Sequence, residues 1–135
     1  MSDGGKRKFR RDWVCFGHRG ARGLAPENTL PSIECGLALG ANGIEIDVHR
    51  VENRLLVIHD ETFDRTTNGG GDVRGSTFEA ARKLDAGGGA RIPTLEEVVD
   101  CVRNRAILNV ELKSPGSAEL TSRILWDRVS RGAAV

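Results

Sequence analysis

Short apolar runs alternate with polar, glycine-rich stretches along this chain, and their spacing predicts an order of strands and helices. Residues 14–16 form a first short strand, and a loop then leads to a helix that begins near Asn28 or Thr29 and ends at Gly40. Gly43 opens a second strand. A strand, a helix and a strand at this spacing make a βαβ unit, so these two strands are predicted to be parallel.

The connection after the second strand is too short for another parallel crossover. It has about four residues, centred on 52–53, whereas a parallel crossover takes a dozen or more. The second and third apolar runs are therefore predicted to form an antiparallel hairpin. Pairing through this turn places residues near 58–60 opposite Glu45 and Asp47, and so brings a histidine back to two carboxylates.

The second half of the chain adds helices and one more strand. A long polar loop leads to a short helix at about 77–83, and a capping box of Thr94 and Glu97 begins the next helix. Residues 107–113 form a third parallel strand, followed by a last helix over roughly 117–130. The buried face of that helix is predicted to consist of Leu120, Ile124 and Leu125. This order predicts an α/β fold with an inserted hairpin.

Composition limits the classes of partner. The chain has 135 residues, enough for one domain or part of one, and its 20 Lys and Arg nearly balance 19 Asp and Glu. This balance gives no information about a nucleic-acid partner, and none is expected. The basic segment 1–11 could bind nucleic acid or acidic lipid, but we interpret it as a disordered N-terminus. No apolar stretch approaches the roughly 18 residues of a membrane span, so no stable membrane insertion is expected.

The three cysteines point to a reducing compartment. Cys15, Cys35 and Cys101 are odd in number and have no metal or redox spacing. We interpret them as small buried hydrophobic residues, one in a strand and two in helices. The chain also lacks the apolar region of a secretory signal, so a cytoplasmic location is predicted.

Polar groups at the predicted strand ends carry the candidate chemistry. Glu45 and Asp47 share one face of the second strand, while the intervening apolar residues face the other way. Two neighbouring carboxylates are costly unless a cation neutralises them. Glu111, at the end of the third parallel strand, would give that cation a third oxygen ligand. Hard oxygen ligands favour Ca²⁺ or Mg²⁺ over zinc.

Histidines and cations complete this set. His18 and His59 lie at strand ends and can transfer protons near neutral pH. Arg19 offers a planar fork for phosphate oxygens and Lys113 a point charge. His49 follows the same strand face further out, and we interpret it as a solvent-exposed or rim residue. Together these groups suit metal-assisted cleavage of a phosphodiester.

Along the chain, in order, stand the motifs His18-Arg19-Gly20, Pro26-Glu27-Asn28-Thr29, Glu45-Ile46-Asp47, His59-Asp60 with Arg65-Thr66-Thr67, Pro93-Thr94-Leu95-Glu96-Glu97 and Glu111-Leu112-Lys113. This ordered set resembles the motifs of the glycerophosphodiester phosphodiesterases, within the phospholipase C-like phosphodiesterase superfamily.

The resemblance implies metal-dependent hydrolysis of a small glycerophosphodiester to glycerol 3-phosphate and an alcohol. His18 and His59 match the catalytic pair, and Arg19 and Lys113 match the phosphate contacts. The matched metal ligands are Glu45, Asp47 and Glu111, and Glu27 matches a further site carboxylate.

The implied fold is a TIM (β/α)₈ barrel, which takes about 250 residues. Residues 12–135 are therefore expected to form a truncated N-terminal part of it, with unpaired strand edges open to self-association or to a second chain. Three alternatives stay open: an active hydrolase, an inactive or partner-dependent fragment that binds phosphate or metal, and a related phosphodiesterase acting on lysophospholipids.

Overall fold

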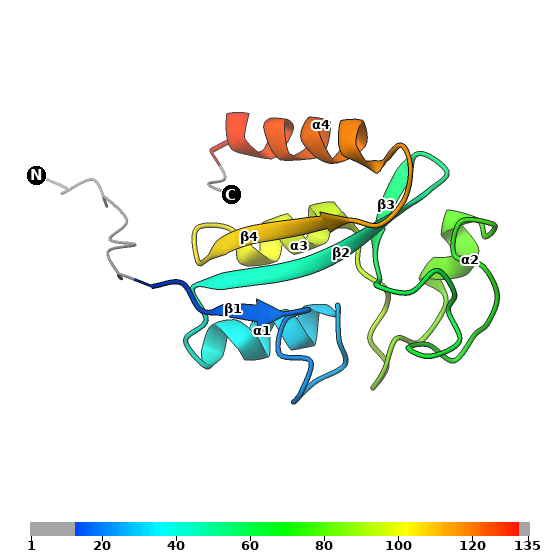
Figure 1. Ribbon diagram of the computed structural model, residues 1–135, viewed down its shortest axis with the longest axis horizontal. Helices are drawn as coiled ribbons and strands as arrows, with labels where there is room; N and C mark the ends of the chain where they lie inside the picture. The colour runs from blue at the N-terminus through cyan, green and yellow to red at the C-terminus, as the bar shows by residue number, and fades with distance from the viewer. Residues whose placement is uncertain (1–12, 133–135) are drawn as a thin grey trace, which may run out of the picture.

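The computed structural model describes residues 13–132, and its elements follow the predicted order (Figure 1). The strands are β1 (Phe16–His18), β2 (Gly43–Val51), β3 (Arg54–Val57) and β4 (Ile107–Leu112). The helices are α1 (Leu30–Ala38), α2 (Phe78–Arg82), α3 (Leu95–Val102) and α4 (Ser117–Ser130). The segment 1–11, predicted to be disordered, lies outside the described residues.

Strand β2 is the centre of the sheet. It pairs in parallel with β1 on one side and with β4 on the other, and its far end pairs antiparallel with β3. The parallel βαβ unit and the hairpin are both confirmed, with the turn at residues 52–53. Beyond β3 the Ile58 amide donates to the Asp47 carbonyl at 3.0 Å, so the chain stays beside β2 as it leaves the hairpin.

One face of β2 forms the main hydrophobic core. Ile44, Ile46 and Val48 are fully buried and pack with residues of α1, α3 and α4. Figure 1 shows α1 and α3 behind the strands, on the side that these apolar residues face. Burying each such side chain contributes about 1.5–3 kcal/mol relative to exposure, so the alternating pattern of β2 fixes which face meets solvent.

Local capping residues set the helix starts. The Thr29 hydroxyl accepts the Ser32 amide hydrogen at 3.3 Å, and the backbone of Thr29 is extended, so Thr29 caps α1 and Asn28 does not. The capping box of Thr94 and Glu97 is present at the start of α3. The predicted inner residues of α4 do pack against the core, but they are half-buried: Leu120, Ile124 and Leu125.

The cysteine prediction was wrong in part. The first strand begins at Phe16, two residues later than predicted, so Cys15 precedes β1 and is exposed. Cys35 and Cys101 are half-buried, and burial together with the neighbouring Glu34 carboxylate raises the pKa of the Cys101 thiol to about 11. All three thiols are free.

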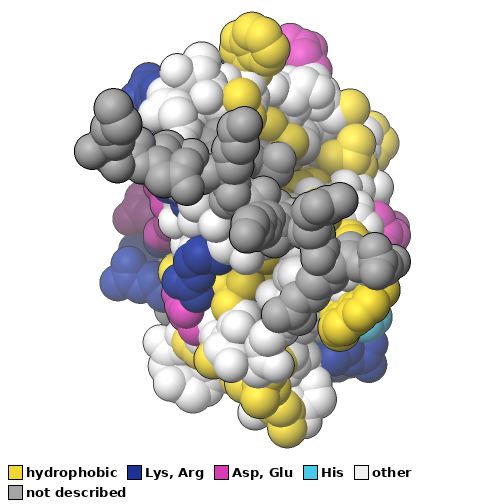
Figure 2. Space-filling model, turned by 90° about the vertical axis from the view of Figure 1, so that its left-hand side faces the viewer, with side chains coloured by type: hydrophobic (Ala, Val, Ile, Leu, Met, Phe, Trp, Pro, Cys, Tyr) yellow, Lys and Arg dark blue, Asp and Glu magenta, His cyan; other side chains and the backbone are white. Residues whose placement is uncertain are grey.

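The sheet has two open edges. Among the described residues, β1 and β4 each pair with β2 alone. Phe16 and Ile107 flank Gly43 in register and are 43% and 41% exposed. Figure 2 shows hydrophobic side chains at the surface of this end of the molecule. No described helix has the length and apolar character that crossing a membrane requires.

Candidate active site

Strand register brings the predicted polar residues together. His18 of β1 pairs with Glu45 of β2, and Asp47 of β2 pairs with Glu111 of β4. Side chains of directly paired residues point to the same face of a sheet. Three strands therefore present a histidine and three carboxylates on the face opposite the hydrophobic core.

The three carboxylates are close enough to share a cation. One oxygen each of Glu45, Asp47 and Glu111 lies within 4.8 Å of the other two. Glu45 and Asp47 are buried, and Glu45 Oε1 and Asp47 Oδ1 have no hydrogen-bond partner. Burial, and then the charge of Asp47, raises the pKa of Glu45. Because unpartnered buried carboxylate oxygens are costly, this arrangement favours a bound positive charge.

The two predicted proton-transfer groups differ in their partners. His18 Nε2 lies 3.6 Å from Glu45 Oε2, and its side chain is 55% exposed. His59 lies two residues beyond β3, and its Nδ1 is 2.8 Å from Asp60 Oδ1. A carboxylate can only accept a hydrogen bond, so the neutral His59 carries its proton on Nδ1 and leaves the Nε2 lone pair available.

His49 is not the exposed or rim residue predicted from the sequence. Its side chain is buried, because β2 continues to Val51 and the chain after β3 covers it. Its Nε2 lies 3.0 Å from the carbonyl oxygen of His59, which the nitrogen contacts as a donor. His49 thus supports the backbone that carries His59.

Arg19 and Lys113 both reach the carboxylate cluster. Arg19 is buried, with its Nη1 donating to Glu27 Oε1 at 2.9 Å and its Nε 3.4 Å from Asp47 Oδ2. Lys113 Nζ lies 3.0 Å from Glu111 Oε1 and 3.9 Å from Asp47 Oδ1. Its hydrogen bond lowers the pKa of Glu111. Cationic groups therefore flank the cluster from two strand ends.

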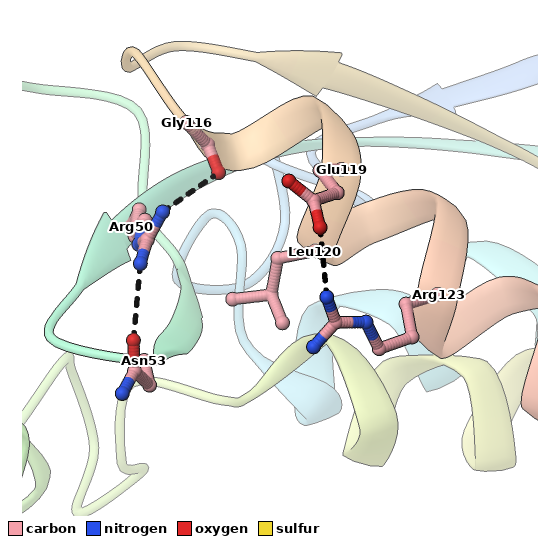
Figure 3. A pocket seen from close by; sticks show the side chains of 6 residues that line it. All are labelled: Arg50, Asn53, Gly116, Glu119, Leu120 and Arg123. Atoms are coloured by element: carbon pink, nitrogen blue, oxygen red, sulfur yellow. Dashed lines mark hydrogen bonds and ion pairs between the residues drawn. The ribbon is translucent and has the colours of Figure 1, made fainter.

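An open hollow of about 410 Å³ lies beside this cluster. It is lined by His49, His59, Asp60, Glu61, Thr62 and Lys113. A second hollow, of about 290 Å³, lies where the β2–β3 turn meets the start of α4 (Figure 3). There Arg50 donates to Asn53 and to the Gly116 carbonyl, and Arg123 donates to Glu119. Both guanidinium groups are bound to protein acceptors, and the Arg50 hydrogen bond to Gly116 joins the hairpin to the start of α4.

Comparison with known proteins identifies the family. The model of the glycerophosphoryl diester phosphodiesterase family matches residues 18–129. The chain belongs to this family. A glycerophosphodiester phosphodiesterase from Caldanaerobacter subterraneus subsp. tengcongensis is 47% identical over 110 residues, which cover 75% of this chain and 45% of that protein. The chain thus spans less than half the length of this curated relative.

Solved structures of the family have the same fold. A glycerophosphodiester phosphodiesterase from Agrobacterium tumefaciens is 39% identical, with a TM-score of 0.75 over 82% of this chain and 53% of that chain. An Oleispira antarctica phosphodiesterase in complex with sn-glycerol-3-phosphate is 30% identical, with a TM-score of 0.78 over 84% and 52%. The α/β fold seen here is therefore the N-terminal portion of the family's TIM barrel.

Sequence reasoning missed the role of Asn28 in this family member. Asn28 has a φ of 57°, and its side-chain amide donates to Asp47 Oδ2 at 3.0 Å. Its Oδ1 also accepts the Asp47 amide hydrogen at 3.4 Å. Asn28 therefore orients a cluster carboxylate rather than capping α1. A residue next to a good cap gives no sign of this contact, which joins positions 19 residues apart.

Proposed function

We propose that this protein hydrolyses glycerophosphodiesters to glycerol 3-phosphate and an alcohol, in a reaction that depends on a divalent metal ion. The observation that carries the proposal is the gathering of three carboxylates, two histidines and two cationic side chains beside the middle of β2. Membership of the phosphodiesterase family supports the substrate class, and a solved relative has been crystallised with the product sn-glycerol-3-phosphate.

The residues present fit a hard divalent cation. Glu45, Asp47 and Glu111 would hold it, because two of them direct buried oxygens without hydrogen-bond partners into the cluster. All three ligands are oxygens, which suits Ca²⁺ or Mg²⁺. When bound, such an ion supplies charge stabilisation to a phosphoryl oxygen.

The protein's own groups would handle substrate charge and protons. Arg19 and Lys113 bind phosphate oxygens at the edge of the cluster. His59 Nε2 takes the proton from the attacking water or substrate hydroxyl as its oxygen bonds to phosphorus. Attack by a substrate hydroxyl gives a cyclic phosphate, which a water molecule then opens to glycerol 3-phosphate. As the bond from phosphorus to the leaving oxygen breaks, protonated His18, held near Glu45, donates its proton to the departing alkoxide. Each such transfer contributes about 10²- to 10⁴-fold to the rate.

The test is release of glycerol 3-phosphate from glycerophosphocholine by the 135-residue chain. We expect turnover with Ca²⁺ or Mg²⁺, none with EDTA, and a loss of about 10²-fold or more in His18→Ala and in His59→Ala. Arg123→Gln is the control, because it removes an exposed ion pair on α4. Full activity in either histidine variant would contradict the assigned roles.

The open sheet edges favour a second candidate: binding without turnover unless the chain self-associates or meets a second polypeptide. Glu111 is half-exposed, and β4 pairs on one side only among the described residues. A site open on this side excludes water poorly. Size-exclusion chromatography of the assayed sample separates the candidates. Turnover confined to an oligomeric fraction supports this second one, and turnover by monomer supports autonomous hydrolysis.

A further inference from the structure

Arg65 lies between two carboxylates that belong to different loops. Its Nε and Nη2 donate to Asp60 Oδ2 and Oδ1, both at 2.8 Å. Its Nη1 and Nη2 donate to Glu27 Oε2 and Oε1 at 3.0 and 2.8 Å. Two edges of one planar guanidinium are therefore each occupied by a carboxylate, a geometry that fixes the orientation of all three groups. A lysine ammonium cannot reproduce it.

The two carboxylates lead to different parts of the candidate site. Asp60 accepts from His59 Nδ1 at 2.8 Å, whereas Glu27 accepts from the buried Arg19 at 2.9 Å. Glu27 follows β1, and Asp60 and Arg65 follow β3. The guanidinium thus joins the loop after β1 to the loop after β3, across 38 positions of sequence.

The electrostatics keep both carboxylates ionised. The Arg65 hydrogen bonds are the largest influence on each, lowering the pKa of Glu27 to about 2 and the pKa of Asp60 well below its usual range. Asp60 therefore stays a pure acceptor for His59 Nδ1. Exposed ion pairs stabilise folds little, and the Arg65 side chain is 49% exposed. Stability alone is a weak reason for this arrangement.

We infer that Arg65 is a positioning residue for His59: anchored by Glu27, it holds Asp60 in the orientation that keeps the His59 proton on Nδ1 and Nε2 free. The inference rests on the proposed function for its consequence in catalysis. Its structural content, the choice of His59 tautomer, can be measured without turnover. It also gives Glu27 a role as an anchor for two arginines.

The experiment reads the imidazole nitrogens directly. Long-range ¹H–¹⁵N correlation spectra of ¹⁵N-histidine-labelled chain, at a pH where imidazole is neutral, separate protonated from unprotonated ring nitrogens. The chain has 3 histidines, and the His59 signals are identified by their loss in His59→Gln. We expect the Nδ1–H form of His59 in the unmodified chain, and at least a several-fold shift toward the Nε2–H form in Arg65→Gln.

Two further variants make the result decisive. Arg82→Gln removes another two-point Arg–carboxylate pair, to Glu97, and is the matched control. Glu27→Gln leaves Arg65 and Asp60 in place, and a smaller shift in the same direction is expected, so it serves if Arg65→Gln does not fold. An unchanged His59 signal in the folded Arg65→Gln or Glu27→Gln chain, or an equal shift in Arg82→Gln, would overturn the inference.

Activity measurements then separate the two proposals. In a chain that releases glycerol 3-phosphate, Arg65→Gln should lower kcat about 10- to 100-fold with little change in KM, and Arg65→Lys should restore only part of it. A fall in kcat no larger than that of Arg82→Gln would overturn the positioning role. If the unmodified chain shows no turnover at all, the proposed function fails, while the tautomer spectra still decide what Arg65 does.

Discussion

Replacing Gly20 by alanine tests how tightly α1 holds the loop that carries His18 and Arg19. Gly20 has a φ of 79°, and a Cβ there would lie 2.6 Å from the Ser32 carbonyl carbon and 2.7 Å from the Ile33 amide nitrogen. The left-handed backbone costs an L-residue about 1–2 kcal/mol. Forcing a methyl group against backbone adds about 1–3 kcal/mol. We therefore expect Gly20→Ala to lower the free energy of unfolding by about 2–5 kcal/mol. This is a large part of the total free energy of unfolding of a typical protein, which is about 5–15 kcal/mol.

The assay is urea denaturation followed by circular dichroism, with Gly40→Ala as the matched control. Gly40 ends the same helix with a φ of 95°, but a Cβ there meets nothing within 4 Å. Gly40→Ala should therefore lower the free energy of unfolding only by the cost of the left-handed backbone, about 1–2 kcal/mol. If the two variants agree within about 0.5 kcal/mol, close packing of Gly20 against α1 does not contribute and the reasoning is refuted.

Three other perturbations test the electrostatics of the site and the capping of α3. The pKa of Glu27 is lowered from 4.5 to about 2, so its ionised form should stabilise the fold fully above pH 4.5, and this stability should be lost as pH falls to about 2. In a pH series of urea melts, Glu27→Gln should reduce the loss of unfolding free energy over this range by about 1–2 kcal/mol after solvent screening. An unchanged pH dependence would contradict this. The raised pKa of Glu45 means that its ionised form costs stability at neutral pH, so Glu45→Gln should raise the melting temperature in EDTA and abolish any stabilisation by Ca²⁺. A lower melting temperature in EDTA would count against this. Thr94→Ala removes the hydroxyl that accepts the Glu97 amide hydrogen at 3.2 Å and should cost about 1 kcal/mol in urea melts, whereas Thr94→Ser should cost much less.

Patterns that depend on neighbouring positions predicted the framework well. The short connection at 52–53 required the hairpin, and the alternation along β2 placed Glu45 and Asp47 on one face with the core residues on the other. The register of three strands then brought His18, Glu45 and Glu111 together. These inferences rest on backbone geometry, which a sequence specifies locally.

What the sequence did not reveal depends on contacts between distant loops. Periodicity put His49 on the face of the carboxylates, but it carries no information about the chain after β3 that covers this residue. Arg19 was predicted as a planar fork for phosphate oxygens, and nothing in the sequence indicated that it also contacts two carboxylates. Arg65 belongs to the motif that begins at His59, but no role was predicted for it, because its partner Glu27 lies 38 positions away.

The alternating residues of β2 serve both the hydrophobic core and the candidate site, and this limits how the gene can vary in length. Its apolar residues hold the helices while the residues between them carry two carboxylates. Inserting or deleting a single codon between Gly43 and Val48 would exchange these two faces, so it would bury the acids and expose the core in one event. Selection should therefore tolerate substitutions among the helix-facing aliphatic residues but reject any change of length in this segment.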